Sequence, residues 1–122
     1  MWFDTNRRKE ARMAERINER ELQHQCVEWF RCNHPDCVLF SVPNEAAHKR
    51  INWFTYTGLL RGAADLVLVL PGKVVFVEMK TRYGRQSDEQ VEFERKCNEL
   101  GVVYVLCRNL EQFIEAVESH LK

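Results

Sequence analysis

Apolar residues recur at helical spacing in three segments of the chain. In residues 17–32, apolar positions three and four apart share one face, and a proline soon afterwards ends the pattern. The second segment follows Ser87, which fits a capping box with Gln90, and Gly101 suits its end. The third follows Asn109, a favourable N-cap residue. The expected apolar stripes are Leu22, Cys26, Val27, Trp29 and Phe30, then Phe93, Cys97 and Leu100, and finally Phe113, Ile114, Val117 and Leu121.

Short apolar runs between these helices have the length of strands. The runs are residues 38–42, 65–70, 73–80 and 102–107. The middle two are joined by Pro71-Gly72 and are dense in Val and Leu, which is typical of strands buried on both faces. Residues 44–61 are too apolar for a solvated loop, and we interpret them as a short helix or a turn.

The element order is therefore α-β-(α)-β-β-α-β-α, which predicts a layered α/β domain. With 122 residues, the chain has the length of a single domain and can bury a real core. We assign residues 17–122 to that domain. Residues 1–16 are rich in charge and weakly apolar, so they form either an extension of the first helix or an arm that binds a partner.

Charge is unevenly distributed, although the net charge is zero. Residues 44–85 hold seven basic and three acidic side chains, whereas residues 86–122 hold four and eight. The middle segment could bind a polyanion, but an ordinary solvated surface would also explain the charge taken alone. Five cysteines without framework spacing indicate reduced thiols, and the longest apolar run is far below the roughly 20 residues that span a membrane. We expect a cytoplasmic protein.

The two middle strands carry the candidate chemistry. If Pro71-Gly72 is a two-residue turn, Asp65 lies opposite Glu78, and Lys80 projects on the same side as Glu78. Opposed carboxylates repel, and a hard cation such as Mg²⁺ relieves that repulsion while water and phosphate complete its ligand shell. Lys80 would then stabilise developing phosphate charge or orient the attacking water. The alternatives are an ion pair without function, or a bulge that moves Asp65 off this face.

Other groupings of reactive residues are weaker. Cys32, His34 and Cys37 lie close in sequence, but a fourth zinc ligand is absent nearby. Three aromatic residues could stack on bases or belong to the core: Trp29, Trp53 and Tyr56. There is no glycine-rich phosphate loop, so we expect no nucleotide cofactor. None of the four histidines stands in a compelling Ser-His-Asp or Cys-His order.

Three motifs in a fixed order resemble the VRR-NUC (virus-type replication–repair nuclease) domain, a branch of the PD-(D/E)XK restriction-endonuclease-like superfamily. They are G-x-x-D at residues 62–65, E-x-K at residues 78–80 and G-R-Q-S-x-x-Q at residues 84–90. The resemblance covers roughly residues 17–118. It implies a restriction-endonuclease-like α/β fold, in which helices flank a small mixed sheet.

The resemblance also implies roles for individual residues. Asp65 and Glu78 match the metal-binding carboxylates, which the backbone carbonyl of Met79 joins, and Lys80 matches the catalytic lysine. Glu19 matches an acid on the first helix that completes the metal site. Glu21 is the competing candidate for that acid. Gln90 matches a recurrent glutamine, although its capping role would explain it equally well.

The implied activity is hydrolysis of DNA phosphodiester bonds with one or two Mg²⁺ or Mn²⁺ ions, on branched DNA such as Holliday junctions. A flap or fork nuclease and a non-catalytic DNA-binding module are the alternatives. The resemblance further implies a homodimer, in a bacterial or phage-infected cell. We expect five basic residues to contact the DNA backbone, which fixes position without reading sequence: Lys49, Arg50, Arg61, Arg82 and Arg85.

Overall fold

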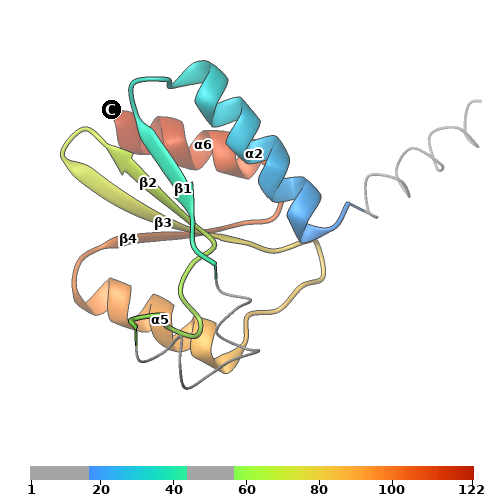
Figure 1. Cartoon of the computed structure of the whole chain (residues 1–122), viewed down its shortest axis with the longest axis vertical. Coiled ribbons are helices and arrows are strands. Elements are labelled where there is room, and N and C mark those ends of the chain that lie inside the picture. Colours follow the sequence, from blue (N-terminus) through green and yellow to red (C-terminus); the bar gives the residue numbers. More distant parts are fainter. Residues whose placement is uncertain (1–16, 44–56) are drawn as a thin grey trace, which may run out of the picture.

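A computed structural model describes residues 17–43 and 57–122. Its elements, in chain order, are α2 (Glu19–Asn33), β1 (Val38–Ser41), β2 (Leu66–Leu70), β3 (Lys73–Met79), α5 (Asp88–Glu99), β4 (Val103–Cys107) and α6 (Leu110–Leu121) (Figure 1). The predicted α/β order is confirmed, with each boundary within two residues of its expected place. Most of the ambiguous segment, residues 44–56, lies outside the described residues, as does the N-terminal segment 1–16.

The sheet is mixed, with strand order β1-β2-β3-β4. The first two pairings are antiparallel, and β3 pairs with β4 in parallel through the α5 crossover. Leu70 lies opposite Lys73 across the two-residue turn, and Gly72 adopts a φ of +66° there. Leu66 lies opposite Val77, so the predicted register is confirmed and the next pair outward is Asp65 and Glu78.

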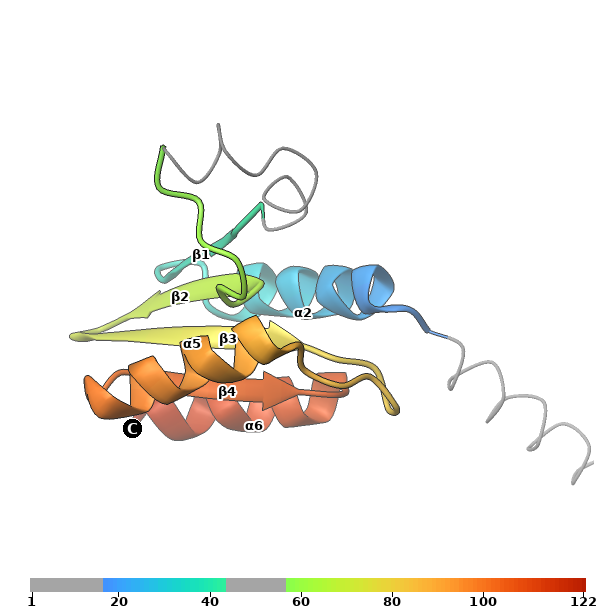
Figure 2. The same ribbon diagram turned by 90° about the horizontal axis from the view of Figure 1, so that it is seen from below.

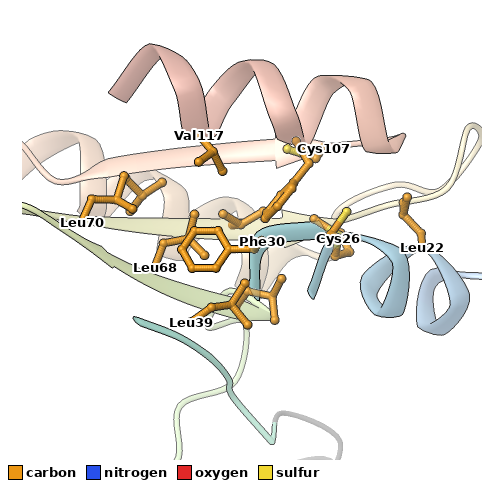
Figure 3. Packing of buried hydrophobic residues seen from close by; sticks show 13 residues of the cluster. Leu22, Cys26, Phe30, Leu39, Leu68, Leu70, Cys107 and Val117 are labelled. Carbon is orange, nitrogen blue, oxygen red and sulfur yellow. The ribbon is translucent and has the colours of Figure 1, made fainter. Parts of the chain in front are cut away.

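Two helices cover one face of the sheet, and α5 lies on the other (Figures 1 and 2). Figure 3 shows Phe30 of α2 between Leu68 of the sheet and Val117 of α6. All three side chains are at most 1% exposed, and burying each contributes about 1.5–3 kcal/mol. Across the sheet, Phe93 of α5 packs edge-on against Phe76, with ring centroids 5.2 Å apart.

Side chains at the helix ends follow the sequence signals. Ser87 and Gln90 form the expected capping box, and Asn109 caps α6 by accepting from Gln112 N–H. Asn18 caps α2 in the same way, which the sequence analysis had not assigned. Gly101 ends the α5 turn with a φ of +72°. No helix among the described residues is long and apolar enough to cross a membrane.

Two expectations about burial were wrong. Leu100 belongs to the expected stripe of α5 but is 78% exposed, because it is the C-cap residue and lies past the last helical turn. The middle strands are not buried on both faces throughout. Val69 and its partner Val74 are 40% and 41% exposed, and both lie away from the core face. The aromatic contacts of α5 are instead with the β3–β4 side of the sheet.

All five cysteines are free thiols, as expected for reduced cysteines. Cys26, Cys97 and Cys107 are buried and act as small apolar residues, whereas Cys32 is exposed. Burial raises the pKa of Cys26 to about 12, and the neighbouring Cys107 adds to that shift. These buried thiols are therefore protonated at neutral pH and serve packing.

Candidate active site

Asp65 is fixed at the point where the chain enters β2. Its Oδ2 accepts a hydrogen bond of 2.7 Å from the backbone N–H of Met79, and its carbonyl accepts one of 2.9 Å from Val42. The preceding turn lies directly against α5, since a Cβ placed on Gly62 would lie 2.3 Å from the carbonyl atoms of Glu89. Gly62 also has a φ of +86°. Only glycine therefore suits this close approach, which sets the position of Asp65.

Glu78 is a carboxyl group almost completely removed from solvent, with 1% exposure. Its Oε1 accepts a 2.9 Å hydrogen bond from Gln90 Nε2, but its Oε2 is buried without a donor. Burial and the neighbouring Asp65 carboxylate together raise the pKa of Glu78 to about 9, while Lys80 opposes the shift. In the absence of a cation, Glu78 therefore keeps its proton at neutral pH.

Gln90 makes the predicted capping contact and also bonds a residue of the candidate site. Its Oε1 accepts from the N–H of Ser87 in the capping box, while its Nε2 donates to Glu78. The first turn of α5 thus holds one oxygen of Glu78 and leaves the other free. One side chain links the helix start to the buried carboxyl group.

Lys80 follows β3 directly and is 9% exposed. Its backbone N–H donates to the carbonyl of Cys107 at 3.0 Å, which continues the parallel pairing past the strand end. Its Nζ lies 3.6 Å from Oε1 of Glu19, the first residue of α2. Of the two acids considered for this helix, Glu19 is the one beside Lys80. The backbone N–H of Glu21 instead bonds the N-cap side chain of Asn18.

The residues present fit a small divalent cation in one respect. A buried carboxylate oxygen without a donor, next to a second carboxylate, is the electrostatic situation that a cation relieves. Among the described residues, however, no group of three or more His, Cys, Asp or Glu side chains is arranged to hold a metal ion. A cation at Asp65 and Glu78 would thus need oxygen atoms from backbone, water or phosphate as well, which Mg²⁺ commonly uses.

The expected DNA-binding residues are only partly gathered near this site. Arg82 and Arg85 are exposed in the segment that follows Lys80, residues 81–86. Arg61 instead lines a groove along α5, together with the acidic residues Asp88, Glu89 and Glu92 and the basic residue Lys96. Lys49 and Arg50 lie outside the described residues, as do the aromatic candidates Trp53 and Tyr56.

Arg108 is a residue near the site that the sequence analysis missed. It follows β4, and its Nη1 donates to the carbonyls of Thr81 (2.8 Å), Arg82 (3.3 Å) and Gly84 (2.8 Å). A signal was available, because a residue that directly follows a strand parallel to β3 must lie at the end that carries Lys80. Arg108 fixes the backbone that leaves the site.

A second missed contact holds the far end of the same segment. Gln86 Nε2 donates to Tyr104 Oη at 3.1 Å and to Glu94 Oε1 at 3.2 Å. Burial raises the pKa of Tyr104, and the nearby Glu78 adds to the shift. The phenol therefore stays neutral beside the acidic pair.

The zinc grouping has no support among the residues that the structure describes. Cys32 is exposed, and the ring of His34 packs against Trp29 and Phe30 with centroid distances of 5.3 and 5.8 Å. Trp29 also contacts Phe113 edge-on, so it belongs to the packing between α2 and α6 rather than to a base-stacking surface.

Comparisons with known proteins bear on the family of this chain and on its fold. A sequence model of the VRR-NUC domain matches residues 4–109. A solved structure described as a VRR_NUC domain protein superposes with a TM-score of 0.71 at 18% identity, covering 86% of this chain and 88% of that one. At this level of identity, the likeness concerns the fold. No curated protein matches the chain.

Proposed function

The chain belongs to the VRR-NUC domain family, and from that premise we propose that it is a metal-dependent nuclease that hydrolyses DNA phosphodiester bonds. The observation that carries the proposal is the buried Oε2 of Glu78, which has no donor and lies next to Asp65 and Lys80. A carboxyl group held in this way is costly for a purely structural site, because its charged form would be shielded from water with one oxygen lacking a donor.

In this proposal Asp65 and Glu78 hold one or two Mg²⁺ or Mn²⁺ ions, with the Met79 carbonyl and Glu19 completing the protein ligands. Once bound, the cation would act as a Lewis acid and lower the pKa of the attacking water. Gln90 orients Glu78 by holding its Oε1. The backbone N–H of Met79 orients Asp65 in the same manner.

Lys80 would supply positive charge to the phosphate as negative charge develops on it. Its side chain is nearly buried, so water screens its field weakly. The ion pair with Glu19 keeps the ammonium group at the site, because it opposes extension of the side chain into solvent. Glu19 thus has two possible partners, Lys80 and the cation.

We further propose that the substrate is branched DNA such as a Holliday junction, cut by a homodimer in the cytoplasm of a bacterial or phage-infected cell. Arg82 and Arg85, with Lys49, Arg50 and Arg61, would contact phosphates. A flap or fork nuclease is the nearest alternative, and a panel of DNA structures separates it from a junction nuclease. The alternative outside enzymes is a DNA-binding module that retains the fold.

The decisive experiment incubates the chain with a labelled four-way junction and Mn²⁺ and follows the cleavage products. We expect cleavage by the unmodified protein, and its loss in Glu78→Gln and Lys80→Ala. Glu118→Gln and Lys122→Ala change exposed residues on and after α6 and serve as matched controls that keep activity. Binding without cleavage in the unmodified protein would favour the non-catalytic module instead.

Salt dependence tests the phosphate contacts separately. If several basic side chains neutralise phosphates, the logarithm of the binding constant should fall linearly with the logarithm of the salt concentration, with a slope of about −0.9 for each contact on duplex DNA. Arg85→Ala should then make that slope shallower by about 0.9, the value for one contact. A binding constant that does not respond to salt would exclude this role for the basic residues.

A further inference from the structure

Tyr83 is a large aromatic residue that the proposed chemistry does not use. It is 77% exposed, whereas Tyr104 is half-buried against α5. The guanidinium of Arg82 lies 5.4 Å from the centre of its ring, in a cation–π arrangement. Exposing a phenol ring to water forgoes the burial that its apolar surface would gain in a core. A ring presented in this way beside a positive charge is suited to a flat, electron-rich partner.

The segment that carries Tyr83 is held at several points. Arg108 donates to three of its backbone carbonyls, and the N–H of Gly84 closes a turn on the carbonyl of Thr81 at 3.1 Å. Gln86 anchors the other end to Tyr104 and Glu94. These bonds fix the backbone on both sides of Tyr83, so binding a partner would require little further ordering of this backbone.

The position of this segment ties it to the proposed reaction. Figures 1 and 2 show that the connection from β3 to α5 projects beyond the end of β3, on the side where α2 begins. Tyr83 is three residues after Lys80, and three residues span at most about 10 Å. Successive nucleotides of a duplex strand are about 3.4 Å apart, so this reach corresponds to a few nucleotides.

We propose that Tyr83 stacks on an unpaired base within a few nucleotides of the phosphate that is cut, and thereby selects DNA with unpaired nucleotides next to a duplex. This rests on the proposed nuclease function and favours its flap or fork alternative, because the strands of a four-way junction can all be paired. In the interior of a duplex each base face is covered by its neighbours and offers no surface to the ring. An unpaired base at a branch or flap offers a free face, and stacking on an aromatic residue tolerates any base sequence.

Binding in the presence of EDTA tests the proposal independently of cleavage. The probes are a blunt duplex and the same duplex carrying an unpaired flap, with 2-aminopurine in the flap next to the duplex. The full chain should bind the flap probe more tightly than the blunt duplex and should change the 2-aminopurine fluorescence. Tyr83→Ala should weaken flap binding about 5- to 150-fold, the range that corresponds to one lost stack, and leave blunt-duplex binding within about twofold.

Two variants separate stacking from general effects. Tyr83→Phe keeps the ring and should bind the flap as the unmodified chain does. Leu100→Ala removes an equally exposed apolar side chain at the end of α5 and should change neither probe. Equal losses on both probes after Tyr83→Ala, or no loss at all, would overturn the proposal. Flap-selective binding through Tyr83 in a chain that cuts no DNA would instead refute the nuclease function and leave the stacking inference standing.

Discussion

Replacing Glu78 by glutamine should stabilise the metal-free protein at neutral pH while abolishing the proposed cleavage. The amide has the shape of the protonated acid. Its oxygen can still accept from Gln90, and its nitrogen can donate to the neighbouring Asp65. The substitution removes the free-energy cost of keeping the side chain protonated in the folded chain, because glutamine is neutral at every pH in both the folded and the unfolded chain.

The magnitude follows from the raised pKa. Burial and the neighbouring Asp65 carboxylate raise the pKa of Glu78 from the ordinary 4.5 to about 9 in the folded chain. Between these values the folded state binds a proton that the unfolded state releases, so stability falls as pH rises through the window. At pH 7 the wild-type chain is therefore roughly 3 kcal/mol less stable than at pH 4.5 on account of this group, at about 1.4 kcal/mol per pH unit. Glu78→Gln avoids that loss.

Thermal or urea unfolding in EDTA measures the effect at pH 4.5 and at pH 7. The two proteins should unfold alike at pH 4.5, whereas at pH 7 the variant should melt on the order of 10 °C higher. Glu118→Gln, at an exposed position on α6, controls for the loss of one surface charge. A variant that is less stable than the wild type at pH 7, or an equal difference at both pH values, would refute the assignment of Glu78 as a buried, protonated acid.

Further predictions concern metal affinity, the glycines of two turns, and Arg108. The apparent Mn²⁺ dissociation constant should fall about tenfold per pH unit up to pH 9 in titration calorimetry, because Glu78 must lose its proton, and a flat profile would exclude Glu78 as a ligand. Gly62→Ala should cost at least about 3 kcal/mol in urea unfolding, from its positive φ and its clash with Glu89. Gly72→Ala, with a positive φ but nothing within 4 Å, should cost only about 1 kcal/mol. Arg108→Lys loses most of its carbonyl bonds and should raise KM for DNA with Mn²⁺ affinity unchanged; weakened metal binding would contradict a role confined to the segment after Lys80.

The hairpin was predictable because local rules determine it. A two-residue turn fixes the register of the strands that flank it, and alternation along each strand then determines which side chains share a face. Asp65 and Glu78 could thus be paired from the sequence alone. The caps Ser87 and Asn109 were predictable for the same reason, since each depends only on residues within one helical turn.

The features that were missed depend on contacts between distant parts of the chain. Arg108 bonds residues 24 to 27 positions earlier, and that contact exists only because β4 runs parallel to β3. The exposure of Val69 was missed because hydrophobic pattern alone does not reveal how much of a sheet one helix covers. The dual use of Gln90 also needed the structure, because a capping pattern is silent about where the remaining amide donor points.

The mixed pairing of β3 explains why the candidate site lies where it does. The antiparallel neighbour β2 begins at the end where β3 stops, which places Asp65 beside Glu78. The parallel neighbour β4 stops at that same end, which brings Arg108 to the backbone after Lys80. A slip of β3 by one residue would turn Glu78 into the apolar face that α2 and α6 cover. The buried core residues on either side of Glu78 along β3 therefore hold the acidic pair in register. Burial of these apolar residues offsets the energetic cost of placing two carboxyl groups side by side.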